Sequence, residues 1–289
     1  MCCCCPPAIS ALFCLWVQSG FSKGTVAGAL TFFPPDPPLY QFERIDEEGN
    51  VIPDDQESGE NQNGEQKKKE QQGETKDGSY KPKEGEMREE MKSPAQQLTD
   101  RTKVLRRQAK KRNQRDARDA KNKVTYKLVL DPRLSVPRYD GGSVSAVKIA
   151  TKKGAYCAAI VYKVPEHLVT ANTKTIIYSH GNATDIGAMF PLQVVLAHGL
   201  ECNVVSYDYS GYGESGGIPM EGNTYTDIAG VFDWTVENIC GNDPKKVILY
   251  GQSVGSGPCC HLAAKNPNIG GMVLHSPFTS GMRVLTPSR

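Results

Sequence analysis

The first 22 residues lack any charged side chain, and they contain no apolar run as long as a membrane span. A secretory signal peptide begins with basic residues before its apolar core, so this absence argues against one. A membrane-spanning helix needs about 20 apolar residues, whereas Pro6-Pro7 and Gln18 bracket only about ten. The sequence is also short of net charge, with +2 over 289 residues, so bulk charge indicates no class of partner.

The ten cysteines are spread unevenly and form no disulfide framework. Half of them are scattered through strand-like and helix-like segments, as small buried hydrophobes are, which fits a reducing compartment. The others gather beside the short apolar run at the N-terminus: Cys2, Cys3, Cys4, Cys5 and Cys14. Such cysteines are candidates for S-acylation, and two or more acyl chains anchor a protein stably to a membrane. The alternatives are plain buried cysteine or a metal site on Cys2 and Cys5. No metal is expected, because no second ligand pair has matching spacing.

Residues 30–42, LTFFPPDPPLYQF, are apolar, aromatic and rich in proline. Proline excludes a helix interior and favours an extended chain. We expect a stiff segment that lies against the membrane interface or the catalytic domain, and an SH3-type ligand is the alternative. Together with the cysteine cluster, this segment makes residues 1–42 the expected membrane anchor.

Residues 43–123 are expected to form a disordered charged linker. Residues 43–60 hold eight acidic residues and one basic residue, and residues 61–100 contain almost nothing apolar. Such a composition buries too little surface to offset the chain entropy lost on folding.

A basic run covers residues 101–123, with eleven basic and two acidic residues. It could be helical, but its apolar residues are few, and Val104, Leu105 and Ala109 make no continuous stripe. The preferred interpretation is a solvated linker, and contact with anionic lipid, a nuclear signal and nucleic-acid binding remain alternatives. Nucleic acid is not the expected partner, because no aromatic residue among the charges offers a stacking platform for bases.

The folded part is expected over residues 124–289, where apolar strands alternate with amphipathic helices. The pattern predicts a hairpin over 145–164, strands over 174–179, 202–207, 247–250 and 271–274, and helices between these strands. Such alternation indicates right-handed βαβ units and a mainly parallel sheet. The runs HGN, DYSGYG, GQSVG and HSP each follow a strand, which is where such sheets gather their ligand chemistry.

The clearest catalytic pattern is the segment 246–264, KVILYGQSVGSGPCCHLAA. It combines a buried strand, a G-x-S-x-G run and a helix, which is the context of a nucleophile elbow. The elbow needs small residues at Gly251 and Gly255, and it would present the Ser253 hydroxyl above the sheet. Because five-residue matches are common by chance, the alternative is a glycine-rich turn between strand and helix, and the flanking elements favour the elbow.

Four runs, HGNA (180–183), SYDYSGYG (206–213), ILYGQS (248–253) and LHSP (274–277) with TSGMRV after it, resemble the α/β-hydrolase-domain 17 group. These are membrane-anchored serine hydrolases that remove palmitate from proteins. The N-terminal cysteine cluster and FxPPxP-like segment of the group resemble residues 2–5 and 33–37. The resemblance covers the first 40 or so residues and about 140–284, so the charged stretch between them looks like an insertion. It implies an incomplete α/β-hydrolase fold, with a mainly parallel sheet and flanking helices after the disordered region.

The resemblance also implies roles for residues. Ser253 would attack the thioester carbonyl of palmitoylated protein substrates and form an acyl-enzyme. The backbone N–H of Val254 would donate to the oxyanion, and a second N–H would come from Asn182 or Ala183. His180 is expected to brace this loop rather than to move protons. No cofactor is implied, and the protein is expected on the cytoplasmic face of the plasma membrane or endosomes.

The triad acid and base follow the serine along the chain in this fold, and in the group both lie beyond the HSP strand. The given sequence stops at Arg289, and residues 285–289 depart from the group. We therefore expect a C-terminally truncated chain that lacks both residues. His275 ends the strand expected beside the elbow strand, so it is the only histidine placed to act as the base. The resemblance favours packing over proton transfer, because this strand-end position matches a residue of the group that is not the catalytic base. Three hypotheses remain. They are a depalmitoylating serine hydrolase, a catalytically inactive membrane-tethered binding module and, resting on residues 101–123 alone, a basic nucleic-acid-associated protein.

Overall fold

The computed structural model describes residues 32–53, 94–138 and 141–278. Their strands form one eight-stranded sheet in the order β1-β2-β3-β4-β6-β5-β7-β8. The strands are β1 (Tyr40–Ile45), β2 (Thr125–Leu130), β3 (Ser143–Ala150), β4 (Tyr156–Lys163), β5 (Thr175–Ser179), β6 (Asn203–Tyr207), β7 (Val247–Gln252) and β8 (Gly271–His275). The helices are α5 (Pro94–Lys121), α6 (Ile186–Leu200), α7 (Glu221–Asn238) and α8 (Ser256–Lys265), with 3-10 turns at Glu166–Leu168, Pro244–Lys246 and Ser253–Gly255. The N-terminal cysteine cluster lies outside the described residues.

The sheet changes from antiparallel to parallel along its width. β1 to β4 pair antiparallel, β4 pairs antiparallel with β6, and the strands from β6 to β8 run parallel. The predicted hairpin and the four predicted parallel strands are therefore confirmed. In the β5–β7 register Ser179 lies opposite Gly251, so the loops after these strands start side by side. This carboxyl edge is where α/β sheets build their sites.

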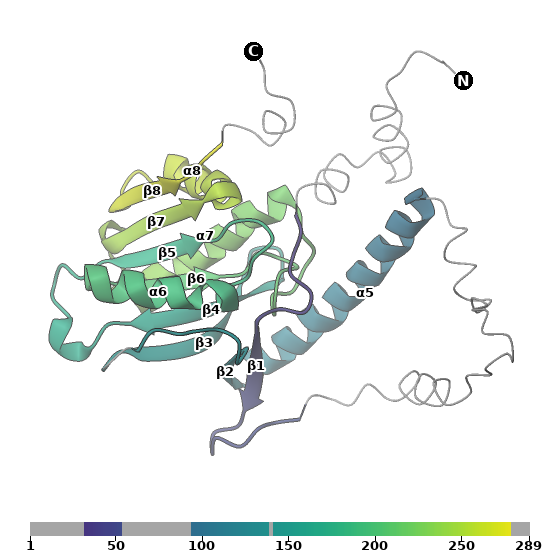
Figure 1. Ribbon diagram of the computed structural model, residues 1–289, viewed down its shortest axis with the longest axis horizontal. Coiled ribbons are helices and arrows are strands. Elements are labelled where there is room, and N and C mark those ends of the chain that lie inside the picture. The colour runs from purple at the N-terminus through teal and green to yellow at the C-terminus, as the bar shows by residue number, and fades with distance from the viewer. Residues whose placement is uncertain (1–31, 54–93, 139–140, 279–289) are drawn as a thin grey trace, which may run out of the picture.

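Helices cover both faces of the sheet (Figure 1). On one face, Phe232 of α7 and Leu262 of α8 join the core, and on the other face Phe190 and Val194 of α6 do so. A parallel strand covered on both faces must be apolar throughout. β5 fits this requirement, because all five residues of its TIIYS sequence are buried.

Residues 40–45 are structured, although the sequence assigned residues up to 42 to the membrane anchor and residues from 43 onward to the disordered linker. They form β1, which pairs with β2 along its whole length. Tyr40 is 1% exposed, and its hydroxyl donates to Oδ2 of Asp208 at 2.5 Å. Arg44 is also buried and contacts Asp119 at 2.6 Å. An arginine at an inward position of the strand hides the alternating pattern that would have revealed it.

Part of the segment 43–123, which was predicted to be a disordered linker, is a helix. Its residues 94–121 form the helix α5, which lies beside β1 (Figure 1), while residues 54–93 fall outside the described ranges. Arg112 of α5 donates to the carbonyls of Gly213 and Ser215 at 2.7 and 3.0 Å. Asn113 accepts from the Gly217 N–H at 3.0 Å.

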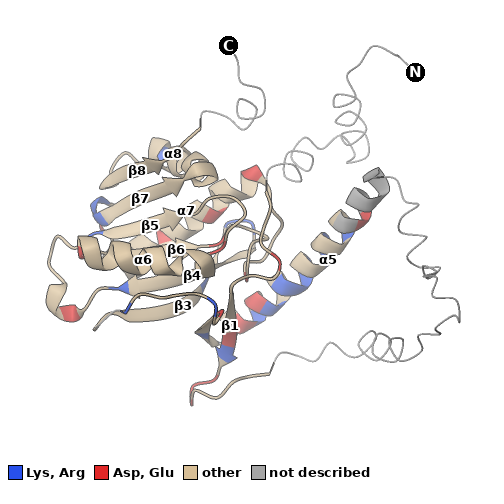
Figure 2. Ribbon diagram, viewed as in Figure 1, with Lys and Arg blue, Asp and Glu red and all other residues tan. Residues whose placement is uncertain are grey.

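The two acidic residues of the basic run face inward from α5. Asp116 contacts Nζ of the buried Lys148 at 3.4 Å, and Asp119 contacts Arg44. Most of the basic residues of the helix are exposed, and Figure 2 shows basic residues spread along it. α5 therefore docks through polar contacts, which a search for apolar stripes does not detect.

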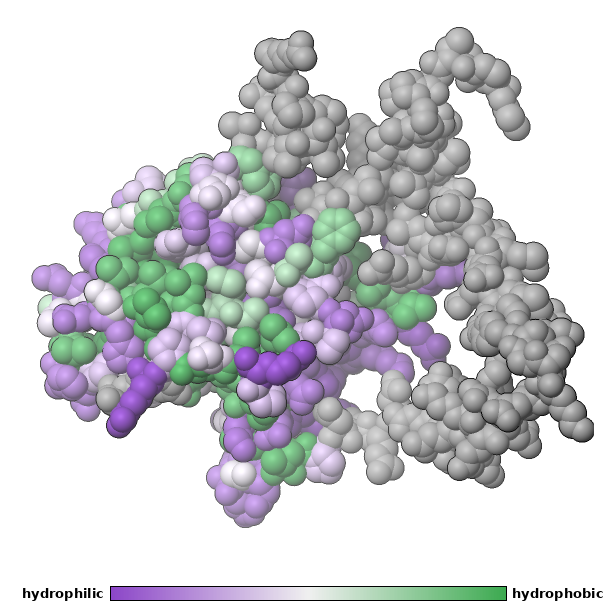
Figure 3. Space-filling model, viewed as in Figure 1, coloured by the Kyte–Doolittle hydropathy of each residue, from purple (hydrophilic) through white to green (hydrophobic). Residues whose placement is uncertain are grey.

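Two apolar surfaces remain open to solvent. On α6, Leu192, Val195 and Leu200 are 36%, 54% and 62% exposed, and Figure 3 shows hydrophobic surface over this helix. On β8, the residues 272–274 are exposed, and β7 is the one neighbour of this strand in the described sheet. Within the described ranges, each helix is either too short or too polar to cross a membrane.

Candidate active site

Ser253 follows β7 directly and has a left-handed backbone conformation, with a φ of 50°. A non-glycine residue rarely adopts this conformation, which costs about 1–3 kcal/mol and persists only where the surroundings enforce it. The 3-10 turn Ser253–Gly255 leads straight into α8. The strand, strained serine and helix that the sequence predicted are therefore present in the structure.

The two glycines of the motif are required by close backbone contacts. A Cβ on Gly251 would lie 2.7 Å from the carbonyl oxygen of Gly255. A Cβ on Gly255 would lie 2.2 Å from the carbonyl oxygen of Ser179 and 2.9 Å from that of His180. These backbone atoms belong to the sheet and to the loop after β5, so they have little freedom to move aside. The turn thus packs directly against the loop that is predicted to complete the oxyanion hole.

In that loop, the side chain of Asn182 is held from three directions. Its Oδ1 accepts from the N–H of Phe33 at 3.0 Å, from the hydroxyl of Tyr212 at 2.7 Å and from the N–H of Ala183 at 3.0 Å. The Ala183 N–H is therefore engaged with its neighbour in this structure, which does not aim it at an oxyanion. The assignment of Val254 and Asn182 as backbone donors stays a prediction.

His180 is fully buried next to this loop. Its Nδ1 donates to the Gly181 carbonyl at 2.7 Å, and Nε2 lies 3.1 Å from Oδ1 of Asp208 without hydrogen-bond alignment. The hydroxyl of Tyr209 donates to the His180 carbonyl at 2.6 Å. Burial raises the pKa of Asp208, although its bond to Tyr40 and the proximity of His180 oppose that shift. These contacts agree with a bracing role for His180.

The proline-rich strap, residues 32–39, belongs to the segment that was predicted to lie against the membrane interface or the catalytic domain, and its contacts place it against the folded domain beside the site. Besides the Phe33 bond to Asn182, its Leu39 N–H donates to Oδ2 of Asp185 at 2.8 Å. The Phe32 ring packs edge-on against Tyr212 with centroids 6.4 Å apart. The apolar, proline-rich composition indicated a stiff extended segment, but it did not indicate which loops this segment contacts. Because proline stiffens the chain, the strap can hold these loops in place.

Among the described residues, no hydrogen bond joins a histidine to Ser253. His275 lies opposite Gln252 in the β7–β8 register, and its Nδ1 is 3.1 Å from the Tyr250 hydroxyl. It is exposed at the end of β8. Ser253 thus follows β7 and His275 ends the neighbouring strand β8, and the contact of His275 with Tyr250 agrees with the predicted packing role.

Potential metal ligands do not cluster in the described ranges, where no three His, Cys, Asp or Glu side chains are placed to hold an ion. The five cysteines found there are free thiols, and four of them are buried.

Asp227 of α7 holds the loop after β6. It accepts from the backbone N–H and from the hydroxyl of Ser210, both at 2.8 Å. Burial is the main cause that raises the pKa of Asp227 to about 6, and the two bonds from Ser210 limit the rise. The Asp227 carboxyl therefore holds its proton to a higher pH in the folded chain than in the unfolded chain.

This shift predicts a pH dependence of stability. Because the folded pKa is above the unfolded one, the folded chain holds more protons than the unfolded chain between about pH 4 and about pH 6, and stability falls as the pH rises through this window. The comparison variant is Asp227→Asn, which keeps an acceptor for Ser210. Relative to it, the free energy of unfolding of the wild type should fall by at most about 3 kcal/mol between about pH 4 and about pH 6. Urea unfolding of both proteins at several pH values measures the difference. A constant difference, or one that grows in favour of the wild type, would contradict the shift.

Comparison with known proteins agrees with this geometry. Residues 170–287 match the hydrolase family described as serine aminopeptidase, S33. Over 113 residues, 39% of the chain, the sequence is 48% identical to α/β hydrolase domain-containing protein aho-3 of Caenorhabditis elegans and 46% identical to protein 17B of Homo sapiens. These matches cover 33% and 38% of those relatives, so the chain aligns with only about a third of their length.

Solved structures of hydrolases are also similar to part of this chain. The Pyrococcus furiosus esterase Pf2001 has a TM-score of 0.40 at 20% identity, covering 50% of this chain and 57% of the esterase. An α/β hydrolase from Vibrio vulnificus has a TM-score of 0.41 at 21% identity, covering 52% of this chain and 50% of that protein.

Proposed function

We propose that this chain is a serine hydrolase with Ser253 as its nucleophile, because residues 170–287, which include the elbow, match a hydrolase family, and 113 residues of the chain are 46% identical to α/β hydrolase domain-containing protein 17B. The observation that carries the proposal is the strained left-handed Ser253 between β7 and α8, enclosed by two glycines that no larger residue can replace. The proposed substrate is a protein cysteine that carries a thioester-linked palmitoyl group.

The proposed reaction has two steps. Ser253 Oγ attacks the thioester carbonyl while its proton passes to a base, and the tetrahedral oxyanion accepts hydrogen bonds from backbone N–H groups. The carbon–sulfur bond then breaks and the cysteine leaves with a proton, so that palmitate remains as an ester on Ser253. Water hydrolyses this ester and releases free palmitate. Val254 and Asn182 are the proposed oxyanion donors.

The reaction requires a base that accepts the proton of Ser253. His275 is the last histidine of the sequence, and it contacts Tyr250 rather than Ser253. Without its base, a triad hydrolase loses on the order of a millionfold in turnover. Among the described residues, the contact of His275 with Tyr250 favours a second candidate function: a membrane-tethered module that binds acyl groups without cleaving them.

We also propose that acylation of Cys2, Cys3, Cys4, Cys5 and Cys14 holds the protein on the cytoplasmic face of a membrane, where palmitoylated substrates are found. The clustering of five cysteines beside a short apolar run supports this anchor. To test this anchor, the four cysteines 2–5 are replaced with serine, and cell fractionation measures how much of the protein stays with the membranes.

The hydrolase proposal is tested with an S-palmitoyl peptide whose freed thiol is measured. The full chain should release thiol, and Ser253→Ala should lower the rate by at least about a thousandfold. Ser276→Ala is the matched control, because Ser276 is also a serine at a strand end with a φ of 50°. Folded wild-type protein that binds the peptide but releases no thiol would support the binding module instead.

A further inference from the structure

We propose that the outward side of α5 and the adjoining proline-rich strap form a surface that docks on an anionic membrane leaflet. The occupant is a layer of acidic phospholipid headgroups. This inference does not depend on catalysis by Ser253, and it can be tested in protein that carries no acyl group.

The charges of α5 are separated by side. Between residues 102 and 121, both acidic residues, Asp116 and Asp119, are fully buried. The exposed charged residues over the same range are all basic: Lys103, Arg106, Arg107, Lys110, Lys111, Arg118 and Lys121. A solvated linker gains nothing from such a separation, whereas a surface that faces fixed negative charge requires it.

The helix is also fixed to the folded part, so its charges act together. Asp116 pairs with the buried Lys148, Asp119 pairs with Arg44, and Arg112 donates to two loop carbonyls. The exposed basic residues of α5 run from Lys103 to Lys121, a length of about 28 Å at 1.5 Å per residue. A rigid basic edge of this length matches an extended anionic surface better than a single small anion.

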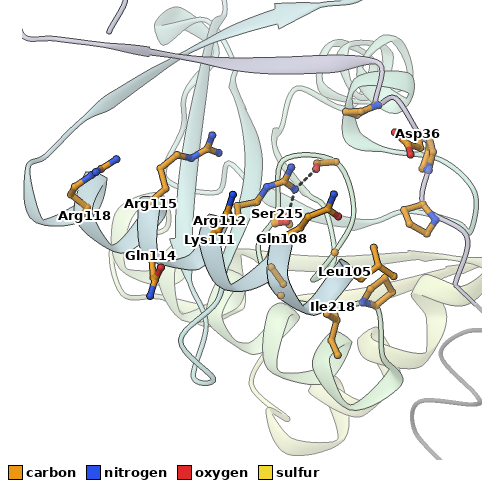
Figure 4. Close-up of a pocket in the computed structure, with 18 residues that line it drawn as sticks. Asp36, Leu105, Gln108, Lys111, Arg112, Gln114, Arg115, Arg118, Ser215 and Ile218 are labelled. Atoms are coloured by element: carbon orange, nitrogen blue, oxygen red, sulfur yellow. Dashed lines mark hydrogen bonds between the residues drawn. The ribbon is translucent and has the colours of Figure 1, made fainter. Parts of the chain in front are cut away.

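Apolar side chains lie beside the basic ones. Val104 and Leu105 of α5 are 53% and 38% exposed, and Phe33 of the strap is 53% exposed. The strap and α5 line a cavity of about 710 Å³, with Pro34 and Pro35 on one side and Leu105 on the other. Figure 4 shows Leu105 of α5 and Asp36 of the strap at this cavity. Exposed aliphatic and aromatic groups among basic residues suit the interface of a bilayer, which accepts both.

The strap also connects this surface to the proposed lipid anchor. Going toward the N-terminus from Phe33, the chain leads within 31 residues to the cysteine cluster. Stable anchoring takes two signals, and a basic surface is one of the signals that complements acyl chains. Nucleic acid fits less well, because α5 has no aromatic residue on which a base could stack.

The experiment uses the full chain produced without S-acylation and sedimented with phosphatidylcholine vesicles that do or do not contain phosphatidylserine. The test variant is Lys103→Glu/Arg107→Glu/Lys110→Glu, whose positions lie along one side of the helix. The control variant is Lys163→Glu/Lys245→Glu/Lys265→Glu, which changes the net charge equally at exposed lysines elsewhere. Circular dichroism and sedimentation without vesicles establish that each protein is folded.

We expect the wild type to bind only the phosphatidylserine vesicles and to dissociate at high salt. Because each basic residue near such a surface contributes about fivefold, the α5 variant should lose at least about tenfold in partitioning, with the control within about twofold of the wild type. Equal losses in both variants would overturn the proposal, since bulk charge would then explain the binding. It would also be overturned by binding that does not depend on phosphatidylserine, or by duplex DNA that binds more tightly than the vesicles and depends on the same three residues.

Discussion

Replacing Gly255 with alanine is expected to destabilise the fold by roughly 3 kcal/mol and to abolish the reaction of Ser253 with an active-site probe. The new Cβ would lie 2.2 Å from the Ser179 carbonyl oxygen and 2.7 Å from its carbonyl carbon. The backbone of Gly255 is ordinary, with a φ of −65°, so the effect comes from the contact and not from conformational strain. Either β5 or the elbow must shift, and both shifts displace Ser253 from the loop beside it.

Gly257→Ala is the matched control for this substitution. Gly257 lies two residues further along in α8, and a Cβ there would meet nothing within 4 Å. Because alanine suits a helix better than glycine, this variant should gain up to about 1 kcal/mol and keep its reactivity. Chemical denaturation and probe labelling measure both effects. If Gly255→Ala were as stable and as reactive as Gly257→Ala, the turn would not be packed as described.

Replacing Asp116 with alanine is expected to cost about 3–5 kcal/mol, because it leaves the ammonium group of Lys148 buried without its carboxylate partner. The two side chains are 0% and 3% exposed. Burial already lowers the pKa of Lys148, and Asp116 is the main group that opposes this shift. Amide exchange should show that α5 loses protection first, since Asp116 joins α5 to β3.

Two further variants distinguish the effect of breaking the buried Asp116–Lys148 pair from the effect of removing an aspartate elsewhere. Asp233→Ala removes an exposed partner, 60% accessible and 3.6 Å from Lys152, and should cost less than about 1 kcal/mol. The double variant Asp116→Leu/Lys148→Met removes both buried charges and should recover most of the lost stability. A loss of under about 1 kcal/mol for Asp116→Ala would mean that α5 is not held by this pair.

The parallel half of the sheet could be predicted from the sequence because its elements follow the simplest rule. β5, β6 and β7 are rich in β-branched residues and must be apolar on both faces. Each is followed by a glycine-containing turn and a helix. The elbow was predictable for the same reason, since its two glycines and its flanking elements are adjacent in the sequence.

The elements that the sequence did not reveal are held by polar contacts between distant residues. β1 has a buried arginine at an inward position, and the few apolar residues of α5 form no continuous stripe. Their partners, such as Asp119 for Arg44, are 75 residues apart in the chain. A prediction from composition treats such a segment as a solvated linker, because no local sequence pattern indicates which of its charged residues become buried.

The same limit applies to the site. Ser253 was identified from five consecutive residues, but the strap that bonds to Asn182 comes from 149 residues earlier. The tyrosine that completes the contact, Tyr212, comes from a third segment. The position of His275 relative to Ser253 also depends on strand order, which the sequence indicated only in part.

The central claim is that Ser253 is a reactive nucleophile, and its most direct test is labelling of the full chain with a fluorophosphonate probe, followed by mass mapping of the modified residue. The account predicts a single adduct on Ser253, retained in Ser276→Ala and lost in Ser253→Ala. Folded wild-type protein without an adduct, or with an adduct on another serine, would contradict it.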